Sequence, residues 1–352
     1  SNDGDVSGNH GGMYDMWVAK LDSAGGIDWQ NCLGGGGTDW AYSVEGTPDG
    51  GCIVTGATTS TDGDVTEHHG GEDMWAVKLT DTGGIDWQKC LGGSGRDGAG
   101  NDVCVVADGY VLAGLSDSTD GDVTENNGDE DFWVVKLDLS GEMVWEHCYG
   151  GSGQDVPLEI KSASDGSLLV TGYTRSSDGD VSEYLGGEHD TWVLKLDALG
   201  NLLWQKSLGG SAKDSGKDIL ETAEGDYLVL STTQSADGYV SELRGGKDVW
   251  AVRLTPFGDI MWERCLGGTG DDKGRVAAVQ TPGCGYLLVT TTDSADGDVT
   301  GHLGDYDCWV VRLAGDDTEP PVLTLLGNAE ETVVCGAEYS DAGATALDAC
   351  DG

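Results

Sequence analysis

The sequence predicts an all-β protein, a β-propeller built from four-stranded blades. Three observations support this class. The first tryptophan of a repeated unit recurs every 58 or 59 residues, at Trp17, Trp75, Trp133, Trp192, Trp250 and Trp309, and a regular period indicates a repeat architecture. Gly accounts for 60 of the 352 residues and helix-forming runs are scarce, which favours short strands joined by tight turns. Finally, each unit carries strand-like segments separated by Gly-containing turns.

The unit has four strand candidates, which we call a to d. They are exemplified by strand a at 131–137, with the pattern Asp-x-Trp-Val-x-Lys-Leu, strand b at 143–148, strand c at 103–106 and strand d at 110–114. Four antiparallel strands in about 58 residues, repeated in tandem, are typical of a propeller blade. A solenoid is the alternative, although its coils are shorter, at about 20–45 residues.

The number of blades depends on how the ends of the chain pair. Strand a occurs six times and the other strands five times each, so we favour five blades, with six as the alternative if sequence precedes this chain. A blade in the order c-d-a-b gives four contiguous blades from about 38 to 266. We expect a closing blade from 274–292, 307–313 and the N-terminal strand 27–32. Strand 15–21 is then an extra edge, and such an edge invites pairing with another chain.

The ten cysteines suggest disulfides, as an even number does in a secreted repeat protein. Cys32 and Cys90 lie at the same place near the end of strand b, which we expect to face the residue before the first Trp of the unit. In the last copy of strand a that residue is Cys308, so we predict a Cys32–Cys308 disulfide that closes the ring. Cys52 is the alternative disulfide partner of Cys32.

Three further disulfides are predicted, with buried free thiols as the alternative for several cysteines. The pairs are Cys90–Cys104, Cys265–Cys284 and Cys335–Cys350.

The domain organisation is indicated by a change in the sequence pattern near Asp316, where the propeller repeats end. Residues 1–315 carry the propeller repeats, 316–321 form an acidic Pro-containing linker, and 322–352 are a separate β segment. That segment is shorter than a complete β-sandwich, for which about 100 residues are usual.

The charge is extremely acidic, with 63 Asp and Glu against 18 Lys and Arg and a net charge of −45. Nucleic acid is a poor partner for such a surface, because phosphate binding needs clustered cations. No apolar stretch is long enough to span a membrane. The charge is interpreted either as a means of solubility in salty water or as a sign of bound divalent cations.

Asp-Gly-Asp loops precede strand a in most units and predict calcium sites. Oxygen ligands on either side of a Gly that permits a sharp turn suit Ca²⁺. The alternative is that these residues form Asx turns without a metal. The predicted ligands are Asp3, Asp5, Asp62, Asp64, Asp120, Asp122, Asp178, Asp180, Asp237, Asp296 and Asp298. A second acidic set follows the Leu-Gly-Gly loop and is predicted to hold turns, namely Asp39, Asp97, Asp155, Asp214 and Asp271.

The units resemble tandem repeats of secreted bacterial and archaeal surface proteins, with Asp-Gly-Asp-Val, Asp-x-Trp-Val-Val-Lys-Leu-Asp and Trp-Gln-x-x-Leu-Gly-Gly-Ser-Gly as shared motifs over residues 1–313. Residues 320–352 resemble the first half of a bacterial Ig-like surface module. The resemblance implies an extracellular, cell-surface propeller joined to an Ig-like segment. The Leu137 to Trp145 hairpin also looks like the tryptophan-docked repeats of quinoprotein propellers, which concerns the fold alone.

The sequence therefore predicts a structural or adhesive surface protein, stabilised by calcium and associating with itself or with other surface proteins as part of an extracellular assembly or filament. The alternative is a carbohydrate-binding, lectin-like propeller that binds glycans. We expect no enzyme, because no metalloprotease, nucleophile-elbow or phosphate-loop motif is present and because the paired carboxylates recur in every unit. A hydrolase needs carboxylates unique to one unit.

Overall fold

The structure is a computed structural model that describes residues 4–98, 102–281, 285–314, 322–325 and 344–347. Every regular element in these ranges is a β-strand. No helix that could cross a membrane occurs among the described residues. The all-β class predicted from the repeat is confirmed.

Four sheets contain four antiparallel strands each, paired in chain order. They comprise β3 (Asp39–Gly46), β4 (Cys52–Thr58), β5 (Asp73–Leu79) and β6 (Ile85–Leu91); β7 (Asp102–Val106), β8 (Gly109–Ser116), β9 (Asp131–Asp138) and β10 (Met143–Tyr149); β11 (Asp155–Ser162), β12 (Leu168–Thr174), β13 (Asp190–Leu196) and β14 (Leu202–Leu208); β15 (Asp214–Glu221), β16 (Tyr227–Thr233), β17 (Asp248–Leu254) and β18 (Ile260–Leu266). The predicted strand order c-d-a-b is confirmed in all four.

The remaining strands form smaller sheets. They are a pair, β1 (Met16–Leu21) and β2 (Ile27–Leu33); a three-stranded sheet, β19 (Asp272–Gln280), β20 (Tyr286–Thr292) and β21 (Asp307–Leu313); and a hairpin, β22 (Val322–Leu325) and β23 (Ala344–Leu347). The predicted closing blade is wrong in one respect, because β2 pairs with β1 and not with β21. A hairpin between neighbours in sequence closes a much shorter loop than a pairing of the two chain ends.

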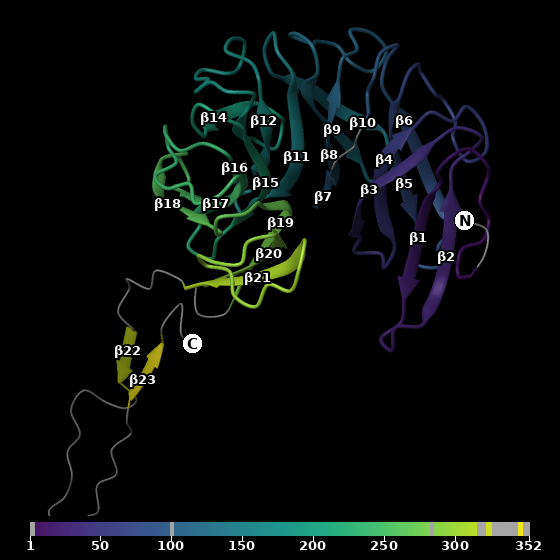
Figure 1. The fold of residues 1–352 in the computed structure, drawn as a ribbon. Helices are drawn as coiled ribbons and strands as arrows, with labels where there is room; N and C mark the ends of the chain where they lie inside the picture. Colours follow the sequence, from purple (N-terminus) through teal and green to yellow (C-terminus); the bar gives the residue numbers. More distant parts are fainter. Residues whose placement is uncertain (1–3, 99–101, 282–284, 315–321, 326–343, 348–352) are drawn as a thin grey trace, which may run out of the picture.

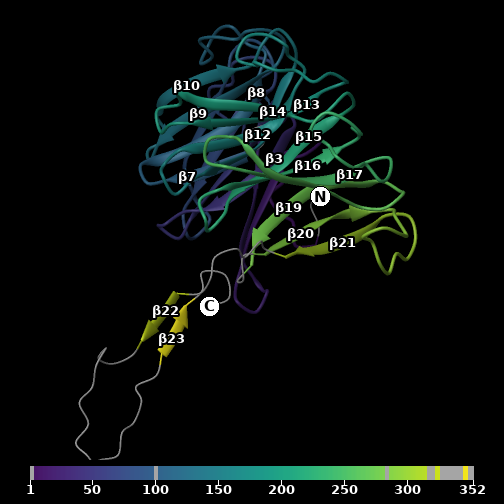
Figure 2. The ribbon, with the colours of Figure 1, turned by 90° about the vertical axis from the view of Figure 1, so that its left-hand side faces the viewer.

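The sheets follow one another around an arc (Figure 1). The first strand of each sheet contacts the first strand of the next, from β3 through β7, β11 and β15 to β19. These five strands form the inner side of the arc. Figure 2 shows the last sheet, β19–β21, beside β15–β17. Among the described residues the strand pairing closes no ring, and the architecture is a propeller-like succession of repeated sheets.

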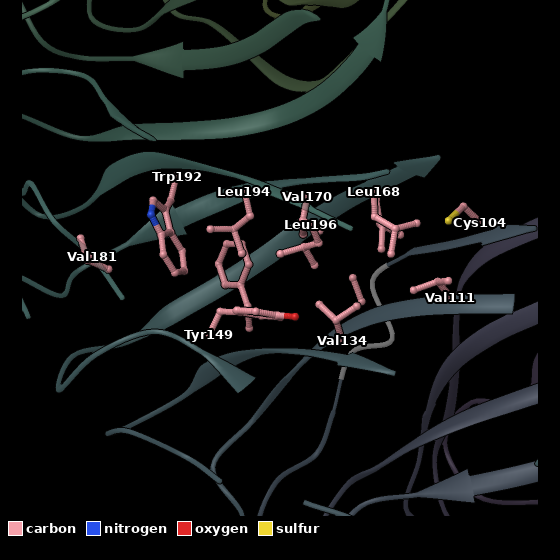
Figure 3. Close-up of a cluster of buried hydrophobic side chains, with 13 residues drawn as sticks. Cys104, Val111, Val134, Tyr149, Leu168, Val170, Val181, Trp192, Leu194 and Leu196 are labelled. Carbon is pink, nitrogen blue, oxygen red and sulfur yellow. The ribbon is translucent and has the colours of Figure 1, made fainter. Parts of the chain in front are cut away.

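The core lies between neighbouring sheets. Every residue of β5, β13 and β17 is buried, because both faces of this strand are covered, and this accounts for its nearly continuous apolar sequence. Figure 3 shows one such layer, in which Trp192 and Leu194 of β13 face Val134 and Tyr149 of the preceding sheet. The ring of Trp192 meets Phe132 edge to face, with centroids 4.8 Å apart.

The tryptophan of the fourth strand links neighbouring sheets at the outer side. The indole nitrogen of Trp29 donates a hydrogen bond to the carbonyl of Asp81 in the next sheet, at 2.9 Å. Gly83 of the same turn has φ of 86° and lies beneath the ring, where an added Cβ would come within 2.7 Å of Trp29. Only glycine suits both the left-handed turn and this close contact. The equivalent hydrogen bonds join Trp87 to Leu139, Trp145 to Ala198 and Trp204 to Pro256.

We predict that Trp192→Ala lowers the free energy of unfolding by about 3–5 kcal/mol, because it removes a large side chain from between two sheets. Trp17→Ala is the matched control, since Trp17 occupies the same repeat position but is 45% exposed, whereas Trp192 is 0% exposed. Urea unfolding followed by circular dichroism measures both. Equal losses for the two variants would contradict the inter-sheet core described here.

Candidate functional site

A pocket of about 960 Å³ opens on the inner strands β11, β15 and β19. Its walls include the bulged segments of these strands and the residues that follow β12 and β16. The three strands come from consecutive sheets, so the pocket exists only because the repeats are arranged around an arc.

The pocket is basic in an otherwise acidic protein. It is lined by six of the 18 Lys and Arg residues in the chain, which are Arg175, Lys213, Lys217, Lys247, Lys273 and Arg275. Two carboxylates, Glu159 and Asp218, line it as well. A concave surface that gathers one sign of charge concentrates the electric field and attracts ligands of the opposite sign.

Lys217 is a partly buried cation of this pocket. Its ammonium group donates a hydrogen bond to the hydroxyl of Ser215 at 2.8 Å, and this partner is neutral. Burial lowers the pKa of Lys217, and the nearby cations Lys213, Lys247 and Arg275 lower it as well, so that together they bring it to about 8. By contrast, Lys213 lies 2.9 Å from Glu188 and Lys273 lies 2.7 Å from Asp271.

Lys217 lines the pocket and lies in a β-bulge of β15. The register of β15 against β16 shifts between Gly216 and Asp218, so that Lys217 is the extra residue. Bulges of this kind redirect a side chain and are common beside functional sites. The strands β3 and β11 have the same shift, around Tyr42 and Leu158, so the repeat supplies the bulge and the sequence decides which side chain occupies it.

Aromatic rings provide flat surfaces in the same pocket. Tyr173 stacks on His189, with ring centroids 4.3 Å apart and an interplanar angle of 25°. Burial lowers the pKa of His189 to about 4, so the imidazole is neutral at pH 7. The ammonium of Lys273 lies 4.9 Å from the centre of the Tyr306 ring. Cations beside aromatic faces suit a ligand that has both a negative group and a ring with an apolar face.

The two carboxyl groups of the pocket occupy equivalent places on neighbouring inner strands. Glu159 follows the bulge of β11 and Asp218 follows the bulge of β15. Burial raises the pKa of both, that of Glu159 to about 7 with a further contribution from Asp102. Lys161 contacts Glu159 and lies 3.6 Å from Asp102. The pocket therefore also holds a carboxyl group that can exchange a proton near neutral pH.

Sequence reasoning missed this pocket. The sequence did contain an indication of the pocket, at the position three residues after the first Asp of the inner strand. Two units have a cation there, Lys217 and Arg275, whereas two others have Tyr42 and Leu158. The convergence of three sheets on these positions was not visible, because it depends on the arc.

The predicted calcium residues lie elsewhere, against the Leu-Gly-Gly loop at the start of each sheet. Asp178 accepts a hydrogen bond from the Ser152 amide at 2.7 Å, and Asp180 accepts one from the Gly150 amide at 3.2 Å. The same contacts join Asp62 to Gly36, Asp64 to Gly34, Asp120 to Ser94, Asp122 to Gly92, Asp237 to Ser211, Asp296 to Thr269 and Asp298 to Gly267. Asp5 is exposed and Asp3 lies outside the described residues. These carboxylates bind two loops together, and calcium stays a prediction.

The aspartates of the second acidic set act as buried hubs, by which we mean buried carboxylates that each accept several hydrogen bonds. Such bonding fits the predicted role of holding turns. Asp155 accepts hydrogen bonds from the hydroxyls of Thr174 and Ser176, at 2.5 and 2.7 Å, and from the Gly151 amide at 2.9 Å. Asp39, Asp97 and Asp214 have the same types of partner. In the last unit the assignment needs correction by one residue, because Asp272, and not Asp271, accepts from Ser294 and from Gly268.

The cysteine predictions need correction too. The structure forms neither Cys32–Cys308 nor Cys90–Cys104, since all four residues are free thiols. Cys32 lies opposite Trp17 itself, one residue from the expected partner. Side chains alternate faces along a strand, so this shift would place Cys32 and Cys308 on different faces even in a joined sheet.

The other predicted disulfides lie partly or wholly outside the described residues. Cys265 is a free thiol, whereas Cys284, Cys335 and Cys350 are not described. The linker 316–321 is likewise outside, and the segment 322–352 is represented only by the antiparallel pair β22–β23.

Comparisons with known proteins show weak similarity. No family model matches the chain. The regulatory protein FlaEY of Caulobacter vibrioides is 23% identical over 192 residues, which cover 51% of this chain and 20% of FlaEY. The chain thus spans a minor part of the length of that relative.

Among solved structures, BamB from Moraxella catarrhalis is similar with 13% identity and a TM-score of 0.35, over 78% of this chain and 76% of that one. A GH43 β-xylosidase/α-arabinofuranosidase from a compost metagenome has 11% identity and a TM-score of 0.37, over 83% and 93%. Because these TM-scores are low, we assign the architecture from the strand pairing of this chain and not from the similar structures.

The expectation that the chain is no enzyme needs correction. The similar structures include GH43 glycoside hydrolases, a GH32 β-fructofuranosidase and a mannose phosphorylase. That finding contradicts the exclusion, and we withdraw it. The absence of sequence motifs was a poor criterion, because catalytic carboxyl groups on separate strands leave no local motif.

We predict that Asp155→Ala lowers the free energy of unfolding by about 3 kcal/mol or more, because it leaves several buried donors without a partner and each such group costs about 1–3 kcal/mol. Asp178→Ala is the control, since it removes an equal charge at an exposed carboxylate of the same sheet and should cost much less. Chemical denaturation measures both variants. Equal losses would contradict the role of Asp155 as a buried hub.

Proposed function

We propose that this chain binds an acidic carbohydrate in the basic pocket of β11, β15 and β19. The observation that carries the proposal is the gathering of six of the 18 cationic side chains in one pocket of a protein with net charge −45. The proposal makes the lectin-like alternative more specific, since it names a site and a ligand class.

The electrostatics of the pocket favour an occupied state. Without a ligand, Lys217 has a neutral hydrogen-bond partner and cationic neighbours, which destabilises its charged form. A carboxylate or sulfate group between Lys217 and Arg275 would relieve this repulsion through charge-assisted hydrogen bonds.

The shape and lining of the pocket favour a sugar ring over a small inorganic anion. A volume of about 960 Å³ is at the upper end of typical ligand sites, about 300–1,000 Å³. Tyr173 and Tyr306 supply aromatic surface, which inorganic phosphate could not use. The pocket thus fits an oligosaccharide with negative substituents.

We predict that Lys217→Met weakens binding of a uronic-acid oligosaccharide about tenfold or more, since hydrogen bonds to charged groups contribute about 1.5–3 kcal/mol. Lys89→Met is the matched control, because Lys89 lies on β6 outside the pocket and its loss changes the net charge equally. Isothermal titration calorimetry, with a neutral oligosaccharide and inorganic phosphate as reference ligands, measures the effect. Equal binding of phosphate, or equal loss in both variants, would contradict the proposal.

The same titration has an expected pH dependence. Lys217 has a pKa lowered to about 8, so it is charged at pH 7 and loses its proton as the pH rises above 8. Affinity for the acidic ligand should therefore fall over this range, and Lys217→Met should remove that step. An affinity independent of pH between 7 and about 9.5 would exclude Lys217 from binding.

A structural or adhesive role at the cell surface is the second candidate, favoured by unpaired strand edges. Among the described strands, β21 lacks the fourth strand that every complete sheet has, and β1 pairs on one side only. Val310 on β21 is 57% exposed. Among the described residues, the buried indole nitrogen of Trp262 has no hydrogen-bond partner, although its equivalents donate to the next sheet. Such edges can pair with a second copy or another surface protein.

Several finer predictions belong to this second proposal. They are the extracellular location, bound calcium at the Asp-Gly-Asp loops, five propeller blades with six as the alternative, and an Ig-like module at 322–352. The acidic loops support calcium because their carboxylates would repel one another less with a cation between them.

We predict that the chain self-associates in calcium and that Val310→Lys weakens this, because a charge on an edge strand opposes pairing. Leu287→Lys is the control, since Leu287 is 40% exposed and lies on β20, which pairs with a strand on each side. Light scattering with calcium and with a chelator gives the mass. A monomer in both conditions would contradict the assembly role.

A further inference from the structure

Three potential metal ligands surround the carboxylate of Asp73 in the second unit. His68 and His69 lie in the loop between β4 and β5, Asp73 begins β5, and Cys90 is near the end of β6. The antiparallel pairing of β5 with β6 places Trp75 opposite Cys90, which brings the thiol next to the start of β5. The loop then folds back so that both imidazoles reach Asp73.

Two of the distances match the edges of a tetrahedral site, and the others would shorten on metal binding. The Oδ2 atom of Asp73 lies 3.4 Å from His69 Nδ1 and 3.3 Å from Cys90 Sγ. All three ligand atoms lie within 4.8 Å of one another. Zinc bonds of about 2.0–2.3 Å to N, O and S imply ligand separations of about 3.3–3.6 Å in a tetrahedron. The fourth position can be filled by His68, whose Nε2 lies 4.0 Å from Asp73 Oδ2.

Two buried polar atoms of this cluster have no hydrogen-bond partner among the described residues, namely Nε2 of His68 and Oδ1 of Asp73. The equivalent Oδ1 atoms of Asp131, Asp190 and Asp248 also lack a partner, so the His68 atom is the one particular to this unit. The Asp73 side chain is 0% exposed and that of His68 is 11% exposed. A buried polar atom without a partner costs free energy, and a cation in the cluster would supply the interaction that Nε2 of His68 lacks. The His69 side chain, 32% exposed, leaves a path from solvent to the cluster.

The cluster departs from the repeat. The aspartate recurs as the first residue of the third strand in the other complete sheets, at Asp131, Asp190 and Asp248. Three other residues replace His69 as the amide donor to that aspartate, namely Asn127, Leu185 and Arg244. The place of Cys90 opposite the tryptophan is taken by Cys148, Ser207 and Cys265. Of the four complete sheets, therefore, β3–β6 alone combines imidazole and thiol groups at these positions.

We propose that His69, Asp73 and Cys90, with His68 as the fourth ligand, form a binding site for a divalent transition metal of the zinc type. A mixed set of nitrogen, sulfur and oxygen ligands suits zinc and not calcium, which takes oxygen ligands. In the site, Nδ1 of His69 binds the metal, and its Nε2 lies 4.0 Å from Asp122, beyond hydrogen-bond distance.

The thiol of Cys90 now donates a hydrogen bond to Asp73. On metal binding this proton leaves to solvent, the thiolate binds the cation, and one proton is released for each ion bound. With four protein ligands the site is structural and joins the β4–β5 loop to β6. It is independent of the basic pocket, with which it shares no residue.

The test is a titration of the chelator-treated full chain with Co²⁺ in excess Ca²⁺, which occupies weak acidic sites. We expect one Co²⁺ per chain with a thiolate-to-metal charge-transfer band, and its loss when Zn²⁺ is added. No such band, or binding of Co²⁺ that Ca²⁺ abolishes, would overturn the proposal.

Matched variants locate the site. Cys90→Ser and His69→Asn, which copy Ser207 and Asn127 of other units, should each weaken Zn²⁺ binding by more than about 100-fold, since loss of outer partners alone costs about 10–100-fold. Cys148→Ser, at the equivalent place in the next sheet, should leave binding unchanged. Unchanged binding in His69→Asn, or a loss in Cys148→Ser, overturns the assignment. His69 is partly exposed, so its variant tests the site even if Cys90→Ser does not fold.

Discussion

The buried aspartate at the start of each inner strand holds the repeat together. Asp155 is 0% exposed, and its oxygens accept hydrogen bonds from the entering loop and from two hydroxyls beyond the neighbouring strand. Burial of a carboxylate costs free energy unless hydrogen bonds compensate it, so the loop, the strand and the hydroxyl groups of this sheet must adopt one relative geometry. Asp39, Asp97 and Asp214 have the same arrangement. In β19–β21, Asp272 accepts from Ser294 and Gly268, and its Oδ1 has no partner among the described residues.

This constraint explains why the sheets can differ in function while sharing a frame. The hub fixes where each inner strand begins, and the bulge then presents one side chain toward the centre of the arc. That position is Leu158 in one sheet and Lys217 in the next. The basic pocket therefore results largely from the side chains at these positions, although the irregularity of β19 between Lys273 and Ala277 is longer than the one-residue bulges of β11 and β15. The His68–His69–Asp73–Cys90 cluster is a second departure of the same kind, at the outer end of another sheet.

Much of the frame could be predicted from the sequence. The period of the tryptophans and the order of the four strands were visible because each is a local pattern. The Asp-Gly-Asp loops were also visible, but their main partners in the structure are backbone amides such as that of Ser152. Cys32 was misplaced because a one-residue difference in register exchanges the two faces of a strand. The spacing of residues along the sequence does not determine the strand register to one residue.

By itself, the sequence determined the repeat, the all-β class and the acidic surface, since these depend on composition and short-range periodicity. The tertiary structure alone decided which sheets meet, that β2 pairs with β1, and that cations of several sheets share one pocket. These features join residues far apart in the chain, and their proximity depends on the curvature of the arc and on strand register. Both are properties of the packed sheets, which no single repeat contains.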